Sequence, residues 1–398
     1  MAITDEEKGV WGVDKVFAKQ NQGSIWDYDT SVRELWLWGY NSGYGNLGQN
    51  NRTNYSSAVQ VPGTTWKMIY SDGDAIGSTR TDGTFWVWGR NANNQGLGIQ
   101  ASGYRSSPVQ LPGTNWPTEP GKATFAAMHS AAIKTDGTLW TWGFNSYGRL
   151  GLGDNQSWNS PKQIPGTTWK TVSLNYEATF ATKTDGTAWA WGWNDNGINS
   201  GILGHNSQTR YSSPIQIGSD TNWSHIQTCG PAVLATKTNG SLWCWGSNTY
   251  GQLGLNQSSS NVRKSSPTQI GSDTDWATGA DKMRTSSRYH MGAIKTDGTL
   301  WCWGENGYGQ LGQNNRTDRS SPRQVPGTWS QISMRHDCCF ALNSDNEVWV
   351  WGRNHQGQLA QNHNNHRSSP VQVYGLNPSG SFSRVQAMKD GAAVIEDK

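Results

Sequence analysis

Nine residues occupy two recurring positions in this sequence, five of them at one and four at the other. Together they could bind an anion. Five cations precede a Ser-Ser-Pro triplet, four directly and Arg210 one residue earlier: Arg105, Arg210, Lys264, Arg319 and Arg367. Four tyrosines stand next to glycine in the loop after a Trp-Gly pair: Tyr44, Tyr147, Tyr250 and Tyr308. Positive charge beside amphipathic rings suits a sulfated or carboxylated glycan, phosphate or an acidic partner. Stacking on nearby aromatic rings, or plain solvation, is the competing interpretation and is favoured, because isolated surface charges contribute little.

Catalytic and metal-binding motifs give a weaker signal. His355, His363 and His366 form the only histidine cluster, in an Asn-rich stretch, where His363 and His366 could share a metal if the loop curls. A solvated loop is the favoured interpretation. The sequence has no GxxxxGK[ST] phosphate loop, no nucleophile elbow and no HExxH helix. We therefore expect no catalytic residue, no cofactor and no bound metal, and a protein that is not an enzyme.

A four-residue unit, Trp-x-Trp-Gly, repeats along the chain at intervals of ~50 residues, the length of a propeller blade. Its seven copies begin at Trp36, Trp86, Trp140, Trp189, Trp243, Trp301 and Trp349. An asparagine follows each copy by two residues, and we expect its side chain to brace the following turn: Asn41, Asn91, Asn145, Asn194, Asn248, Asn306 and Asn354.

Turn signals divide each repeat into short strands. Asp-Gly or Asn-Gly precedes most Trp-x-Trp units, as at Asp136-Gly137, and this dipeptide is typical of a β-hairpin. The proline of each Ser-Ser-Pro cannot donate to a ladder and so marks an edge strand. The pattern predicts about four strands per repeat and no helix. It predicts an all-β fold, a seven-bladed β-propeller of four-stranded blades over residues 30–398.

Ring closure and core follow from the same register. Residues 392–396 match the strand that the first repeat lacks, so the C-terminal strand is predicted to close the ring. Of the 24 tryptophans, 20 fall at repeat positions. Because residues i and i+2 share a strand face, both indoles of a unit should pack between blades, and we expect these 20 to form the core.

The stretch HSAAIKTDGTLWTWGFNSYGRLGLGD closely resembles the repeat of the regulator of chromosome condensation family, which implies a seven-bladed propeller. The founding member is an exchange factor for a small nuclear GTPase with a basic, chromatin-binding tail. This chain departs from that pattern. Its first residues are acidic, no basic nuclear signal stands out, and the histidine frequent in the family appears only at His129 and His290.

Residues 1–29 precede the repeats and read as a leader, helical or extended. Thr4 and Glu7 could form a capping box ahead of an apolar side. The leader resembles, weakly, the short N-terminal leaders of structural proteins of tailed bacteriophages, which implies an anchor to a particle. The anchor residues would be Val10, Trp11, Val13, Phe17 and Trp26.

Charge and composition argue against several classes of function. The net charge of +3 is too small for a general nucleic-acid binder. No signal peptide and no apolar run long enough to enter a membrane are present, and five cysteines at irregular spacing indicate reduced thiols.

We therefore expect a non-enzymatic interaction or display propeller, a virion structural or host-attachment protein that binds a protein partner through its leader. It could form a homo-oligomer within the particle. The alternatives are a cytoplasmic exchange-type regulator of a small GTPase and a lectin-like propeller that binds glycans at its rim.

Overall fold

The computed structural model describes residues 31–398 except 42, 72, 92–95, 195–200, 260–261, 374–375 and 377–379. Residues Arg33–Lys398 form one compact unit. The predicted leader, its anchor residues and the predicted boundary after residue 29 lie outside the described residues. The described part of the chain contains no helix, and so none that could span a membrane.

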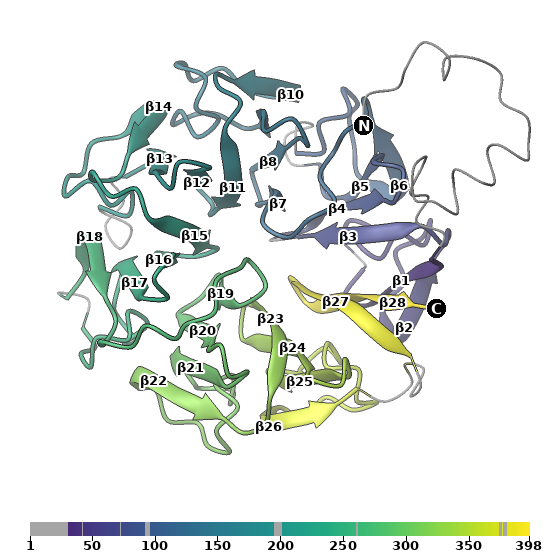
Figure 1. Ribbon diagram of the computed structural model, residues 1–398. Coiled ribbons are helices and arrows are strands. Elements are labelled where there is room, and N and C mark those ends of the chain that lie inside the picture. Colours follow the sequence, from purple (N-terminus) through teal and green to yellow (C-terminus); the bar gives the residue numbers. More distant parts are fainter. Residues whose placement is uncertain are drawn as a thin grey trace, which may run out of the picture. The chain divides into compact units, whose positions relative to one another are not determined.

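Seven antiparallel four-stranded sheets form a ring, which confirms the predicted propeller (Figure 1). Blade 1 is β27-β28-β1-β2, and blades 2 to 7 take the remaining strands four at a time in chain order. The first strand of each blade contacts the first strands of its neighbours and so lies innermost. These inner strands are β3 (Trp66–Tyr70), β7 (Ala123–Phe125), β11 (Trp169–Leu174), β15 (Trp223–Thr228), β19 (Met283–Thr285), β23 (Trp329–Arg335) and β27 (Ser381–Met388).

The second strands are β4 (Ala75–Arg80), β8 (His129–Ile133), β12 (Ala178–Lys183), β16 (Ala232–Lys237), β20 (His290–Ile294), β24 (Cys338–Asn343) and β28 (Gly391–Asp397). The third strands carry the Trp-x-Trp-Gly units: β5 (Phe85–Gly89), β9 (Leu139–Gly143), β13 (Ala188–Gly192), β17 (Leu242–Gly246), β21 (Leu300–Gly304), β25 (Val348–Gly352) and β1 (Arg33–Gly39). The outer strands are β6 (Arg105–Leu111), β10 (Trp158–Ile164), β14 (Tyr211–Gln216), β18 (Lys264–Gln269), β22 (Arg319–Val325), β26 (Arg367–Gln372) and β2 (Tyr55–Val61).

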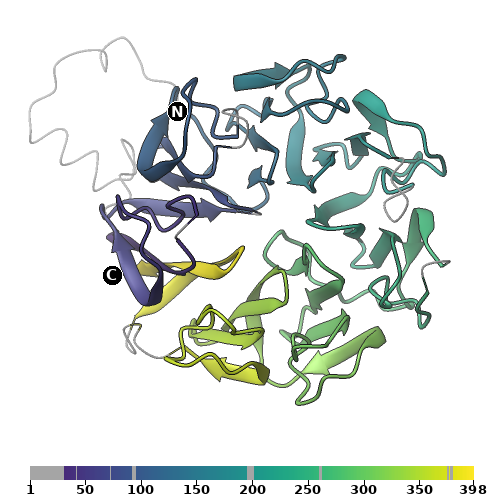
Figure 2. The same cartoon turned by 180° about the vertical axis from the view of Figure 1, so that it is seen from behind.

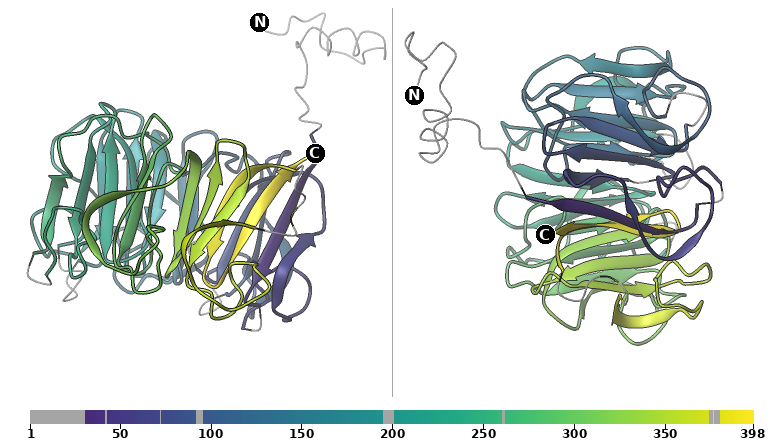
Figure 3. Two further views of the ribbon diagram at one scale, coloured as in Figure 1. Left: turned by 90° about the horizontal axis from the view of Figure 1, so that it is seen from below. Right: turned by 90° about the vertical axis from the view of Figure 1, so that its right-hand side faces the viewer.

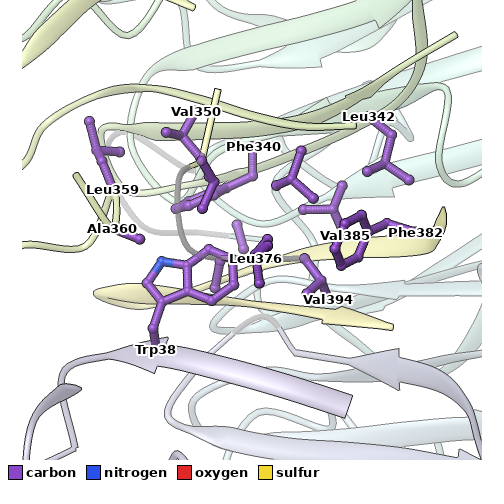
Figure 4. Packing of buried hydrophobic residues seen from close by; sticks show 14 of the residues in the cluster. Trp38, Phe340, Leu342, Val350, Leu359, Ala360, Leu376, Phe382, Val385 and Val394 are labelled. Atoms are coloured by element: carbon purple, nitrogen blue, oxygen red, sulfur yellow. The ribbon is translucent and has the colours of Figure 1, made fainter. Parts of the chain in front are cut away.

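Blade 1 joins strands from both ends of the chain, as the sequence predicts (Figure 2). Strand β28 pairs with β1 along its whole length, with Val394 opposite Trp36. The ring is therefore closed by backbone hydrogen bonds between segments more than 350 residues apart in the sequence. Figure 4 shows Trp38 of blade 1 packed toward Leu359 and Ala360 of blade 7, which completes the core across this seam.

The two indoles of each unit differ in burial, and this corrects the prediction that both belong wholly to the core. The second tryptophan is 0% exposed in every blade. The first is half-buried, because it packs against the edge of the core and reaches the rim. The seven half-buried rings are Trp36, Trp86, Trp140, Trp189, Trp243, Trp301 and Trp349.

The second indole of every Trp-x-Trp unit bonds to the preceding blade. The Nε1–H of Trp191 donates to the carbonyl of Arg149 in blade 3 at 3.0 Å, and Trp38 donates to the carbonyl of Gln358 in blade 7 at 3.0 Å. A buried indole N–H needs an acceptor, and here the acceptor belongs to a different sheet. The tryptophans therefore fix each blade to the one before it, around the whole ring.

Candidate protein-interaction face

One end of the strands carries the long loops, and we call it the loop face. Here the inner strand turns into the second strand, and the third strand runs through a long loop to the outer strand. The opposite end, the hairpin face, carries the tight turns between second and third strands. Seen from the side, the ring presents these two ends as separate surfaces (Figure 3).

The asparagine after each Trp-Gly pair holds the long loop rigid, as predicted. Asn306 is fully buried, and its Oδ1 accepts the backbone N–H of Leu311 at 2.9 Å. Its Nδ2 donates to the carbonyls of Asn315 and Thr317, both at 3.1 Å. The corresponding bond to a leucine N–H is present in all seven blades. The loops that shape this face are therefore held in place.

Each of these loops leans on the next blade, and this explains one recurring glycine. Gly148 has φ +72°, and a Cβ there would lie 2.5 Å from the Cα of Ser212 in blade 4. Only glycine allows so close an approach. The loop and the Ser-Ser-Pro strand of the following blade thus form one continuous surface.

The four loop tyrosines make contacts with the following blade. Tyr147 packs on Trp193, with ring centroids 3.8 Å apart, and Tyr250 packs on Tyr289 at 4.6 Å. Tyr44 contacts Tyr104 at 4.7 Å, and Tyr308 contacts His366 at 5.1 Å. The rings are partly exposed, so they join neighbouring blades while keeping one edge at the surface.

The five cations occupy equivalent places around the ring. Arg105, Lys264, Arg319 and Arg367 each start an outer strand opposite the glycine of the Trp-Gly pair. They do not gather into one patch, and several are engaged locally. Arg210 lies over Trp193 at 4.1 Å and over Tyr147 at 5.8 Å, and is the only one of the five set over a predicted tyrosine ring among the described residues.

Other members of this set bond within their own loops. Arg105 donates to the carbonyls of Ser102 and Tyr104, both at 3.1 Å. Arg367 bonds to His363 at 2.7 Å. Arg105 and Arg367 thus bond within their own blades, whereas Arg210 also lies over Tyr147 of the preceding blade. Anion binding by the five cations and four tyrosines remains a prediction.

The histidine cluster braces a loop of blade 7. His363 Nε2 bonds to Arg367, His366 Nδ1 accepts the N–H of Asn354 at 2.9 Å, and His355 Nε2 contacts Arg353 at 3.2 Å. Each ring thus has its own protein partner. Within the described ranges, no group of three or more His, Cys, Asp or Glu side chains is arranged to hold a metal ion.

Four acids at one repeat position of the loop face escaped sequence reasoning. Asp74, Glu177, Asp337 and Asp390 share one repeat position, since the carbonyl of each accepts the N–H of the residue after the Trp-Gly pair. That shared position, directly before the second strand, was the signal that could have revealed them. Because this position is the same in each blade, the four acids lie on the same face of the ring.

Two of these acids form ion pairs with nearby cations. The carboxylate of Asp337, fully buried, lies 3.3 Å from Arg353 and 3.5 Å from Arg288. Asp74 lies 3.3 Å from Lys389 and 3.5 Å from Arg90. Arg288 and Lys389 keep 46% and 37% of their side chains exposed, so positive charge reaches solvent here.

Burial also perturbs ionisable groups between blades. It lowers the pKa of His290 to about 3, with a smaller contribution from the nearby charge of His336. It lowers the pKa of His129 well below its usual value, assisted by the charge of Arg149. His129 bonds to Thr179 of blade 4 at 3.0 Å, so this neutral imidazole joins two sheets. All five cysteines are buried thiols, and burial raises the pKa of Cys302.

Comparison with known proteins points to one repeat type. The model of the Regulator of chromosome condensation (RCC1) repeat matches residues 136–181, 239–278, 297–342 and 345–391. The Ultraviolet-B receptor UVR8 of Arabidopsis thaliana is 27% identical over 213 residues, covering 50% of this chain and 44% of the receptor. Human Protein RCC2 is 27% identical over 252 residues, 54% of this chain and 46% of that protein. The chain thus spans about half the length of these relatives.

A solved structure agrees in fold. Prp20p from Saccharomyces cerevisiae, described with its binding to Gsp1p and histones, aligns over 93% of this chain and 92% of its own, with a TM-score of 0.76 and 15% identity. This likeness shows the fold alone, and the RCC1-type repeats that the sequence predicts are supported by the repeat model and the sequence relatives. The predicted resemblance to bacteriophage proteins finds no support in these comparisons.

Proposed function

We propose that this propeller of RCC1-type repeats is a non-catalytic regulator that binds a protein partner through its loop face. The observation that carries the proposal is the set of acids and partly exposed cations in the turns between inner and second strands on that face. Rigid loops reduce the entropy lost on binding, and paired charges favour one partner orientation. The virion and glycan-binding interpretations stay predictions of the sequence.

Exchange-type regulation of a small GTPase is the more specific form of this proposal. It is supported by the likeness to Prp20p, whose structure is described with binding to Gsp1p. The exposed charges of Arg288 and Lys389 offer contacts for a charged partner surface. The action of the loop face would be to favour one conformation of the partner by differential binding.

The test uses the purified full chain with Gsp1p loaded with a fluorescent GDP analogue. We expect saturable binding and faster nucleotide release, and we expect Lys389→Glu to weaken both. Thr114→Glu adds charge in an exposed connection on the hairpin face and serves as the matched control. Binding without faster release would contradict exchange activity, and absence of binding to both Gsp1p and histones would contradict the partner class.

A further inference from the structure

In five blades a cation lies over two tryptophans at the hairpin face. The cation is the last residue of the second strand or directly follows it. One ring belongs to the aromatic residue that starts, or leads into, the inner strand, and the other is the first indole of Trp-x-Trp. The five cations are Arg80, Lys134, Lys183, Lys237 and Lys295, at 4.0 to 5.2 Å from the ring centroids.

Blade 4 illustrates the arrangement. Lys183 Nζ lies 4.7 Å from the ring of Trp169 and 4.2 Å from that of Trp189. The Trp189 Nε1–H donates to the Thr187 hydroxyl at 2.8 Å, so a neutral group orients the indole. A cation over an indole face is attracted by the ring quadrupole. The repeat thus builds an indole cage and fills it with its own ammonium group.

Blade 7 keeps both indoles but changes the two polar positions. Asn343 stands where the cation stands elsewhere, opposite Trp329 in the ladder. Its Nδ2 donates to Glu347 at 2.7 Å, so the side chain turns back on its own hairpin. Glu347 replaces the Thr or Ser that orients the half-buried indole, and its carboxylate accepts from Trp349 Nε1 at 3.3 Å. Compared with the five blades described above, this hairpin lacks the cation and carries an additional carboxylate.

A cleft of about 590 Å³ opens at this place. Trp329 and Trp349 line it, with their rings 6.2 Å apart and nearly perpendicular at 89°. Asn343, Asp345 and Pro326 also line it. Over the residues that the structure describes, no Lys or Arg side chain lies on either of these two rings. Blade 1 has no such cage, because Phe382 and Glu396 replace the indole and the cation.

We propose that this cleft binds the side-chain ammonium of a lysine presented by a partner protein. The molecule itself shows what the cage accepts, since four of the five equivalent positions hold lysine. The carboxylates of Glu347 and Asp345 provide the counter-charge. Elsewhere Asp220 and Asp273 have that role, each 2.7 Å from the lysine of its blade.

This site lies beside the β24–β25 turn, and the cleft continues to residues 312–314 in the long loop of blade 6. Its lining includes none of the four acids of the loop face. It does not depend on the proposed function, and a partner could use one surface without the other.

The test titrates the full chain with acetyl-Gly-Lys-Gly-amide and follows the indole N–H signals of Trp329 and Trp349 by NMR, with Trp349→Phe to assign them. We expect saturable shifts at millimolar peptide and no shift with the norleucine peptide, which has the same carbon chain without the charge. The variant Asn343→Lys should fold normally and weaken binding ~10-fold or more, because its own ammonium fills the cage.

A transplant provides the reciprocal test. Lys183→Asn with Thr187→Glu should empty the blade 4 cage and give it the same response, seen at Trp169 and Trp189. Thermal unfolding shows that each variant is folded before it is titrated. The proposal is overturned by equal binding of the norleucine peptide, by preference for an arginine peptide, by unchanged binding in Asn343→Lys, or by a folded transplant that stays silent.

Discussion

Single residues in this protein act mainly between sheets. His290 sits in the second strand of blade 6 and reaches Cys339 of blade 7 at 3.6 Å, and His129 makes the matching contact to Thr179. Both imidazoles are buried neutral. A buried base that cannot accept a proton makes the folded state sensitive to acid.

The free energy of unfolding should therefore decrease as the pH is lowered below about 6.5, the pKa of an unperturbed histidine. The unfolded chain binds protons at His129 and His290 from there downward, while folded His290 does so only near pH 3. The unfolding free energy should drop by ~1.4 kcal/mol per pH unit for each histidine across that window. Urea unfolding at pH 4.5 to 7.5 measures this. In the variant His290→Gln, the dependence of the unfolding free energy on pH should be smaller by the contribution of one proton, ~1.4 kcal/mol per pH unit. An unchanged dependence would show that His290 does not make this contribution.

At the scale of elements, one buried asparagine braces each long loop. Replacing Asn306 by Ala leaves the N–H of Leu311 and two carbonyls without a partner. We expect a loss of ~2–4 kcal/mol of unfolding free energy. The exposed Asn364→Ala, in the corresponding loop of blade 7, should stay within ~0.5 kcal/mol. Chemical denaturation measures the unfolding free energy of both variants. Similar losses in the two would show that the buried amide of Asn306 is not the cause of the destabilisation.

The sequence predicts the strands and turns well, but it predicts poorly which residues of neighbouring blades contact one another. Strands, hairpins and the bracing asparagines follow from local turn chemistry, and the vacancy in the first repeat locates the closing strand. The role of the loop tyrosines in a binding surface stays a prediction. The sequence does not reveal that their contacts, such as Tyr147 with Trp193, cross to the next blade. Asn343 carries no signal in the sequence that marks it as part of a site. Its importance depends on two indoles that only the folded sheet brings together.

At the scale of the whole molecule, stability depends on one seam. Strand β28 pairs with β27 and β1, and Val394 is fully buried between them. Val394→Pro removes a ladder donor at the centre of this seam and should destabilise the ring by ~3 kcal/mol or more. Lys398→Ala, in an ion pair with Glu34 at the margin, should have little effect. Differential scanning calorimetry compares them, and a normal melting temperature for Val394→Pro would show that blade 1 does not hold the ring together.

The placement of β27 and β28 in blade 1 has a consequence for biosynthesis. Strands β1 and β2 leave the ribosome first, yet their partners are made only after all the other blades. Until then β1 has an unpaired edge that a chaperone could protect or that another nascent chain could occupy. Two half-made chains could therefore exchange these strands, and the yield of monomer should depend on translation speed.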